Sequence, residues 1–334
     1  IMKIIAELAQ GFEGDLNQAK ILLKAASSSG ADIAKLQLVY ADELATSDYI
    51  HYKLFKSLEM SDNEWKDLYD YSRELKIELN FDIFGKKSLK LSEKLGIKGI
   101  KLHGTDITNI GLLREVAKSK IKNIYLGAGG SNIDEIKMGI SILKNKNIIL
   151  LLGFQSYPTP DCDNQISRLS YLKNILGNGN VEIGFADHAN PNSSLSIALA
   201  AIAIGAGSTV IEKHLTLGKV MKLEDHESAL NPDEFFNFTK TIKLCYKAFG
   251  SISTNNDFNM SKSEKTYRKM IRRHVTSSRD IKKGTVISAE DLVLKRTSSK
   301  IFIHDINTVL NKTVSEDIKK NTAINKDVLK WKEN

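Results

Sequence analysis

Eight short apolar runs, each followed by a longer segment of helical periodicity, fill the first 250 residues of the chain. The runs are rich in β-branched residues, as strands are, and the longer segments repeat apolar residues every three or four positions, as amphipathic helices do. Eight strand-to-helix units of this size match a (β/α)8 TIM barrel and fit a six-stranded doubly wound sheet poorly. We therefore predict an α/β fold built on a TIM barrel.

The predicted elements alternate along the chain, and the segment Tyr40–Glu59 between the second strand and its helix is predicted to be a loop that contacts the substrate. The strands are Lys3–Glu7, Ile33–Leu38, Glu78–Ile83, Gly99–Leu102, Asn123–Leu126, Ile148–Leu152, Val181–Phe185 and Thr209–Lys213. The helices are Leu16–Ser28, Asp62–Leu75, Lys87–Leu95, Ile110–Ala117, Ile133–Leu143, Gln165–Ile175, Ser194–Ile204 and Asp233–Ala248.

A change in composition ends the repeating pattern near residue 250. Residues 251–263 are rich in Ser and Asn and lack periodicity, which is typical of a linker. We predict a barrel domain over residues 1–250, a linker over 251–272 and a compact domain over 273–334. Because about 60 residues form only a marginal core, we expect the small domain to pack on a barrel, its own or a partner's.

The composition limits the class of protein. Apolar residues make up 42% of the chain, charged residues 26%, and there are only 4 prolines, so extended disorder is excluded. The longest apolar runs, 147–154 and 195–206, are shorter than the roughly 18 to 20 residues that span a membrane. Two cysteines cannot form a disulfide framework and no signal-peptide pattern is present, so we expect a cytoplasmic protein without membrane contact.

The net charge of +8 comes from the C-terminal part of the chain. From Lys262 to the end there are 18 Lys and Arg against 9 Asp and Glu, which leaves 30 against 31 in the rest. Such a tail can bind nucleic acid, but its charges are scattered through apolar periodicity, with few aromatic residues to stack on bases. We therefore expect small-molecule substrates and no nucleic acid.

Polar or glycine-rich residues stand at or just after the end of every predicted strand. In a TIM barrel these ends meet at one rim, where active sites lie. One charged residue in a strand often faces solvent, but barrel strands are covered on both sides, so a whole set needs a functional reason. Lysines, histidines and carboxylates at one rim indicate an anionic substrate and a metal ion. The set is Glu7, Lys35, Gln37, Asp82, Lys101, His103, Gly127–Gly130, Gln155, Tyr157, Asp187, His188, Glu212, Lys213 and His214.

Two of these residues, His188 and His214, end adjacent predicted strands. Neutral imidazoles so placed can share a divalent cation, and two histidines with water and substrate oxygens suit Mn²⁺, Fe²⁺ or Zn²⁺. The spacing alone does not choose among these metals, nor between a metal site and two packing histidines. Away from the strand ends, His51, His274 and His304 belong to no such group.

Ordered motifs run along nearly the whole chain. In the barrel they are Ile5-Ala6-Glu7, Gly30-Ala31-Asp32, Lys35-Leu36-Gln37, Asp106-Ile107-Thr108-Asn109, Ser156-Tyr157-Pro158-Thr159-Pro160, Asp187-His188, Ile211-Glu212-Lys213-His214, Asp225-His226 and Asn231-Pro232-Asp233-Glu234-Phe235. Together they resemble the sialic acid synthases, which condense phosphoenolpyruvate with an N-acylated sugar aldehyde to form nine-carbon nonulosonic acids. Residues 280–284 and 291–296 look like parts of the antifreeze-like domain (SAF, a β-clip fold) that follows the barrel in that family.

The resemblance implies roles for individual residues. His188 and His214 would bind a divalent metal, Mn²⁺ in the family, which polarises the sugar aldehyde. The antifreeze-like domain would cross to the other subunit of a domain-swapped homodimer and carry Arg296 to the partner's active site. The implied catalytic residues are Glu7, Tyr157 and Asp225, and the implied substrate-binding residues are Lys35, Gln37, Lys101, Asp106, Gln155 and Arg296.

Four hydroxyl groups of the family's donor site are missing from this chain. Asp82 stands where the family has threonine, and Gly104, Gly127 and Ala186 stand where it has serine. Each hydroxyl bonded to a charged oxygen is worth roughly 1.5 to 3 kcal/mol, so an uncompensated loss would weaken donor binding strongly. Candidates for compensation are Thr105, a protonated His103 and the backbone N–H groups of Gly127–Gly130.

The sequence leaves three functions open. The first is a divergent nonulosonic acid synthase that uses phosphoenolpyruvate and an N-acylated hexosamine. The second is a metal-dependent aldolase or lyase of the same ancestry that uses a donor without phosphate. The third is a non-catalytic binding or assembly subunit, against which the retained histidines, lysines and carboxylates argue.

Overall fold

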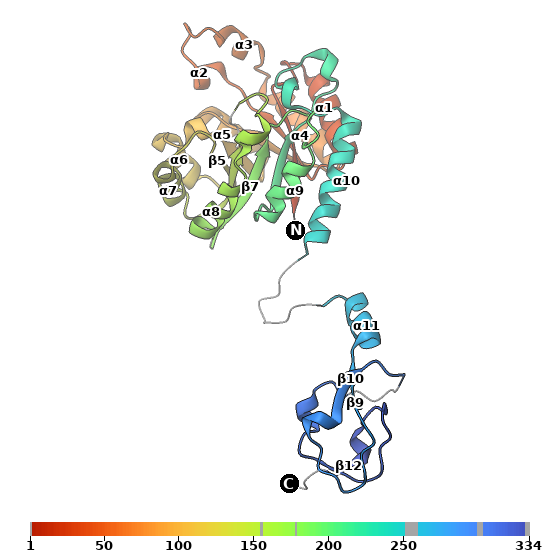
Figure 1. The fold of residues 1–334 in the computed structure, drawn as a ribbon. Coiled ribbons are helices and arrows are strands. Elements are labelled where there is room, and N and C mark those ends of the chain that lie inside the picture. The colour runs from red at the N-terminus through yellow and green to blue at the C-terminus, as the bar shows by residue number, and fades with distance from the viewer. Residues whose placement is uncertain (1, 154–155, 178, 251–259, 299–302, 331–334) are drawn as a thin grey trace. The chain divides into compact units, whose positions relative to one another are not determined.

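The computed structural model describes residues 2–153, 156–177, 179–250, 260–298 and 303–330. The chain divides into two compact units, Ile1–Gly250 and Ser251–Asn334 (Figure 1). None of the helices in the described ranges combines the length and the hydropathy that a membrane span needs.

The first unit is a closed barrel of eight parallel strands in chain order, in which β8 pairs with β1. Every predicted strand is present, and its ends lie within two residues of the predicted ones. The predicted TIM barrel is confirmed. The strands are β1 (Lys3–Ala9), β2 (Ile33–Gln37), β3 (Glu78–Asp82), β4 (Gly99–Leu102), β5 (Asn123–Gly127), β6 (Asn147–Gly153), β7 (Val181–Asp187) and β8 (Val210–His214).

Helices cover the outside of this barrel in the predicted order. Their apolar faces pack on the strands: Trp65 of α4 is fully buried, with its ring edge-on to Phe12 and Phe81 at centroid distances of 5.4 and 5.2 Å. The helices are α1 (Leu16–Ser28), α4 (Asp62–Glu74), α5 (Lys86–Leu95), α6 (Ile110–Lys118), α7 (Ile133–Ile142), α8 (Ser167–Leu176), α9 (Ala198–Gly205) and α10 (Pro232–Phe249).

Alternate residues of the strands point into the barrel. An apolar layer that includes Ile5, Ile33, Tyr125, Ile149 and Val210 fills its interior. Because the strand period is two, the residues two positions further along share the same inward face and lie closer to the C-terminal rim. On these strands they are Glu7, Lys35, Gly127, Leu151 and Glu212.

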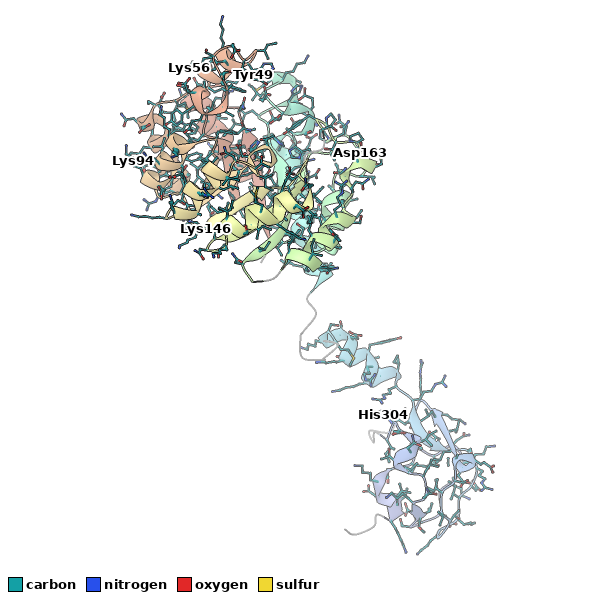
Figure 2. The ribbon with its side chains drawn as sticks, turned by 90° about the vertical axis from the view of Figure 1, so that its left-hand side faces the viewer. Tyr49, Lys56, Lys94, Lys146, Asp163 and His304 are labelled. Carbon is teal, nitrogen blue, oxygen red and sulfur yellow. The ribbon has the colours of Figure 1, made fainter. Side chains whose placement is uncertain are left out.

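The segment between β2 and α4 is not the plain loop that the sequence predicts. It contains two short helices, α2 (Ala41–Leu44) and α3 (Tyr52–Ser57), which lie together beside one end of the barrel (Figure 1). Tyr49, labelled in Figure 2, stacks on Phe55 at a centroid distance of 6.0 Å. Four- and six-residue helices carry too little periodicity to be recognised in a sequence.

Helix α2 is tied to the barrel by the carboxylate of Glu43. The residue at the N-terminus of α5 is Gly85, which has no side chain to cap the helix. Glu43 accepts hydrogen bonds from the backbone N–H groups of Lys87 at 2.5 Å and Ser88 at 3.1 Å, and from the Ser88 hydroxyl at 2.6 Å. A distant carboxylate therefore satisfies the N–H groups that a local cap normally satisfies.

The second unit is a small β domain. Strand β9 (His274–Ser277) pairs antiparallel with β10 (Leu292–Lys295), and β11 (Thr313–Val314) pairs antiparallel with β12 (Leu329–Lys330). Its separate core is Val275, Ile281, Ile287, Leu292, Ile303, Val309, Val314, Ile318, Ile324 and Leu329. The predicted appended small domain is therefore present.

The predicted linker, 251–272, is not irregular throughout. Residues 262–271 form helix α11 (Lys262–Ile271), which starts at a capping box between Ser261 and Glu264. Residues 251–259 lie outside the described ranges. The domain boundaries 1–250, 251–272 and 273–334 stay a prediction.

The cap on α5 gives a stability prediction. We expect Glu43→Ala to cost about 1 kcal/mol, as lost helix caps do, and to lower the melting temperature of the barrel by roughly 2 to 4 °C. Scanning calorimetry measures the shift. Glu74→Ala, at the exposed C-terminal end of α4, is the matched control and should leave the melting temperature unchanged; equal shifts in both variants would contradict the capping role.

Candidate active site

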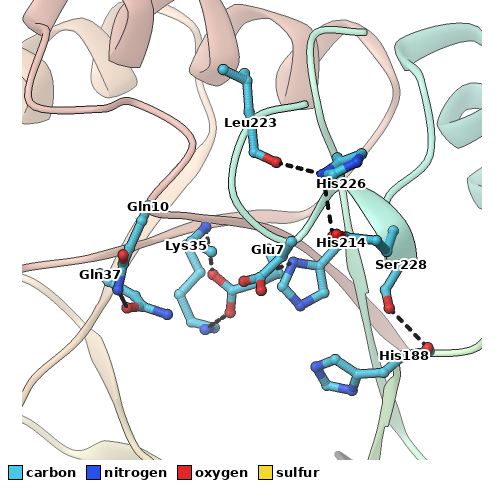
Figure 3. Close-up of polar contacts among 12 residues, drawn as sticks. Glu7, Gln10, Lys35, Gln37, His188, His214, Leu223, His226 and Ser228 are labelled. Carbon is cyan, nitrogen blue, oxygen red and sulfur yellow. Dashed lines mark hydrogen bonds and ion pairs between the residues drawn. The ribbon is translucent and has the colours of Figure 1, made fainter. Parts of the chain in front are cut away.

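A buried network of charged side chains lies inside the C-terminal end of the barrel. Lys35 forms a close ion pair with Glu7 (Figure 3) and donates to Asp82 at 2.5 Å. Lys101 donates to Glu212 at 2.5 Å and lies 3.8 Å from Glu7. Lys35 is also 3.6 Å from Glu212, so the five side chains form one connected cluster, and all five are buried.

The network has more carboxylates than lysines, three against two. Burial lowers the pKa of Lys35, because desolvation opposes its charge more than the carboxylates favour it. Burial opposes the charge of Lys101 as well, but Glu212 and Asp82 outweigh it and raise its pKa. Lys35 is thus enclosed by carboxylates, and Lys101 is the lysine of this network that reaches the cavity above it.

Asp82 also binds an imidazole. Its Oδ2 accepts a hydrogen bond from Nε2 of His103 at 2.7 Å, and its side chain is fully buried. Burial alone would raise the pKa of Asp82, but Lys35, Lys101 and His103 together bring it below its ordinary value. The Asp82 carboxylate, at a position where the sequence resemblance implies threonine, is therefore ionised and shared between a lysine and a histidine.

A cavity of about 320 Å³ opens over the network. Glu7, Asp82, Lys101 and His103 form one part of its lining, and His188 and His214 form another. Among the described lining residues, Lys101 is the only Lys or Arg, and the only hydroxyl groups are those of Thr105 and Tyr157. The described wall of this cavity is therefore poor in hydroxyl groups.

The two histidines of the predicted metal site face one another across this wall. His188 and His214 are 4% exposed, and their ring centroids lie 5.0 Å apart. Burial lowers the pKa of His188 to about 3 and that of His214 well below its usual value, so both imidazoles are neutral, as metal ligands must be. The described residues contain no group of three or more His, Cys, Asp or Glu that could hold a metal.

Hydrogen bonds fix the orientation of His188. Its Nδ1 lies 3.0 Å from the carbonyl oxygen of Ala186, which places the proton on Nδ1 and the lone pair on Nε2. Its own carbonyl accepts from the Ser228 hydroxyl at 3.0 Å (Figure 3) and from the N–H of Thr159 at 2.8 Å. The donor set fits a divalent cation that takes its other ligands from water or substrate.

A second ion pair lies behind the histidines, on the outer face of the strands. The neighbours of His188 and His214 in sequence, Asp187 and Lys213, are fully buried and 3.1 Å apart. Lys213 also donates to the carbonyl of Ala189 at 3.0 Å. Both residues lie at the predicted rim, but they do not line the cavity, because the strand alternation that turns the histidines inward turns their neighbours outward.

Gly104 and Gly127, for which the sequence resemblance implies serine, share one packing reason. A Cβ atom at Gly104 would lie 2.4 Å from the carbonyl oxygen of Gly129, and one at Gly127 would lie 2.6 Å from the nitrogen of Gly104. The turns after β4 and β5 therefore touch backbone to backbone. A serine at either position would force them apart, so these two replacements belong together.

The remaining predicted residues surround an outer cavity of about 430 Å³. Gln37 accepts from Gln10 at 2.7 Å (Figure 3) and lines both cavities, as Tyr157 does. Asp106 and Asp225 line the outer one. Burial, followed by the nearby Glu224 and Glu227, raises the pKa of Asp225 to about 7.

Two predicted site residues are not placed in this cavity system. Gln155 lies outside the described residues. Arg296 directly follows β10 in the second unit and is exposed there. Its delivery to a partner's barrel in a homodimer stays a prediction.

Sequence reasoning assigned no individual role to Glu212, and it named His103 as a candidate to replace a missing hydroxyl without finding its partner. Glu212 bonds Lys101, and its position two residues before His214 is the signal that places both on the inward face. His103 likewise lies two residues from Lys101, so both are on the inward face. The residue that His103 bonds, Asp82, is on another strand, β3. Only the closure of the barrel shows that pairing.

The model of the NeuB family matches residues 22–254, and that of the SAF domain matches residues 272–330. The chain belongs to the NeuB family. N,N'-diacetyllegionaminic acid synthase of Campylobacter jejuni is 30% identical over 96% of this chain and 98% of its own. Uncharacterized protein MJ1065 of Methanocaldococcus jannaschii is 31% identical over 98% and 93%.

The solved structure of a sialic acid synthetase agrees with the fold. N-acetylneuraminic acid (sialic acid) synthetase of Leptospira borgpetersenii, in complex with citrate, superposes with a TM-score of 0.72 at 26% identity, covering 81% of this chain and 92% of that one. The resemblance inferred from the sequence motifs is therefore confirmed at the level of the family. The chain is a NeuB-type, nonulosonic acid synthase-like protein.

The paired histidines give a metal-binding prediction. We expect His188→Ala or His214→Ala to weaken Mn²⁺ binding more than about 100-fold. Even the loss of a group that bonds to a ligand without touching the metal lowers metal affinity about 10- to 100-fold. Isothermal titration of the full chain measures the affinity. His51→Ala, at the exposed start of α3, is the control and should bind Mn²⁺ as the unsubstituted chain does; unchanged binding in all three variants would place the metal elsewhere.

The outward ion pair gives a second prediction. Lys213→Met leaves the Asp187 carboxylate buried without its cation, which should cost about 3 to 5 kcal/mol of stability. Adding Asp187→Asn removes the unpaired buried charge, so the double variant should be more stable than the single one. Thermal unfolding of both variants decides: a double variant no more stable than Lys213→Met would show that the pair does not act as a unit.

Proposed function

We propose that this protein is a nonulosonic acid synthase that condenses phosphoenolpyruvate with the open-chain aldehyde of an N-acylated hexosamine and releases phosphate. The observation that carries the proposal is the pair of neutral imidazoles, His188 and His214, beside a cavity whose wall contains Lys101 and Glu7. A chain of the NeuB family with this arrangement has a site for a divalent cation and an anionic donor in one cavity. Membership of the family supports the reaction type.

The reaction needs an acid–base group and an anion-binding group, and the site offers both. Carbon three of phosphoenolpyruvate bonds to the aldehyde carbon, water adds to carbon two, and the bond from carbon two to the phosphate oxygen breaks as the ketone forms. Of the two protons of the water, one ends on the former aldehyde oxygen and the other on the released phosphate. Lys101 binds the donor anion, and Glu7, held by a 2.8 Å hydrogen bond from the N–H of Ala9, takes the proton of the water. Mn²⁺ held by His188 and His214 would supply electrophilic polarisation of the aldehyde oxygen.

The outer cavity indicates the charge of the acceptor. Carboxylates of Glu43, Asp106, Glu224 and Asp225 line it, and no Lys or Arg does among the residues that the structure describes there. A phosphorylated or acidic sugar would be repelled by this lining. We propose that the acceptor is an uncharged N-acylated hexosamine.

One observation favours an alternative reaction. Lys35 is enclosed by carboxylates and Asp82 adds a negative charge where the family has a hydroxyl, which disfavours a donor with three negative charges. A metal-dependent aldolase that uses pyruvate would not need the phosphate interactions. The two reactions differ in whether phosphate is released.

The test is phosphate release by the full chain with Mn²⁺, phosphoenolpyruvate and a panel of N-acylated hexosamines, each with and without a 6-phosphate. We expect release that requires metal and sugar, with the neutral sugars as substrates. Glu7→Gln, which is nearly isosteric, should lower the rate about 10²- to 10⁴-fold, the range of a lost acid–base group. A sugar acid formed from pyruvate without phosphate release would support the aldolase instead.

A further inference from the structure

One histidine of the inner cavity has no part in the proposed reaction. His103 lines both the inner and the outer cavity, and 31% of its side chain is exposed. Its Nε2 is bound to Oδ2 of Asp82 at 2.7 Å, and its ring lies against Phe84 at a centroid distance of 5.3 Å. The imidazole is thus held by a buried carboxylate and an aromatic ring, and it borders the space where a substrate would bind.

The carboxylate behind this imidazole determines its chemistry. Asp82 is fully buried, ionised and also bonded to Lys35, so it accepts from Nε2 and does not donate to it. An imidazole that lies between this carboxylate and a bound anion can donate from both ring nitrogens when it is an imidazolium. Because Nε2–H is engaged, Nδ1–H is the group that can donate to a ligand.

The donor needs such a group. Phosphoenolpyruvate carries a carboxylate and a phosphate, yet Lys101 is the only Lys or Arg among the described lining residues and is already bonded to Glu212. The close contact of Gly104 with the turn after β5 excludes a serine hydroxyl there. Without another cationic side chain, the described lining of the cavity would present more carboxylates than cationic side chains to the donor.

We propose that His103, held in place by Asp82, binds the phosphate group of the donor as an imidazolium, in place of the missing hydroxyls. The inference rests on the proposed function, since it takes the donor to be phosphoenolpyruvate. Asp82 is a positioning residue, which acts through the imidazole and keeps its own charge buried behind the ring. An aspartate at position 82 then supports anion binding, because it acts together with the histidine at position 103.

The first experiment titrates the full chain, with Mn²⁺ present, with phosphoenolpyruvate and separately with pyruvate, which lacks the phosphate. His103→Gln keeps a polar side chain but cannot carry the charge. We expect it to weaken phosphoenolpyruvate binding about 10- to 100-fold, the range for a lost charge-assisted hydrogen bond, and to leave pyruvate binding unchanged. An equal loss of affinity for both ligands would overturn the inference, because a structural defect would weaken binding whether or not the ligand carries a phosphate.

The second experiment tests whether Asp82 acts through His103. If Asp82 only repelled the donor, Asp82→Asn would tighten phosphoenolpyruvate binding in every background. We expect Asp82→Asn to weaken binding when His103 is present and not to weaken it in the His103→Gln background, where no imidazolium remains. A cooperative thermal unfolding transition above the assay temperature confirms that each variant is folded; tighter binding by Asp82→Asn alone would overturn the positioning role.

The results separate this inference from the proposed function. Tight phosphoenolpyruvate binding that survives His103→Gln would overturn the role of His103 and leave the synthase reaction intact. Failure of the unsubstituted chain to bind phosphoenolpyruvate, with binding of pyruvate, would overturn both and favour the aldolase.

Discussion

The contact between Lys35 and its three carboxylates is the constraint on which the site depends. Charges buried inside a barrel are tolerated only when they are paired, so Glu7, Asp82 and Glu212 can project into the interior because the two lysines project with them. This arrangement fixes the floor of the cavity. Lys35 is bonded to carboxylates of the protein, so Lys101 is the lysine of the network that lines the cavity.

The upper part of the cavity follows from the alternation of the strands. His188 and His214 point inward, while Asp187 and Lys213 point outward and form their own buried pair. The same two strands therefore hold a neutral pair of imidazoles on one face and an ion pair on the other. The ion pair joins β7 to β8 at the residues next to the histidines, so it helps to set the distance between the two rings.

Much of this could be predicted from the sequence, for physical reasons that differ among residues. The barrel strands were recognisable because each is a separate run of β-branched residues, and the histidine pair because both end adjacent strands. Helices α2 and α3 were missed because four and six residues carry too little periodicity. The contact between Asp82 and His103 was missed because it joins side chains 21 residues apart on two strands.

The sequence by itself determined the order of strands and helices, the family and the residues at the strand ends, because periodicity and motifs are local properties of the chain. Only the tertiary structure decided which of those residues meet. Barrel closure brings Glu212 of β8 to Lys101 of β4, turns Lys213 away from the cavity and presses Gly104 against Gly129. Such contacts depend on the direction of side chains across the barrel, which no local pattern contains.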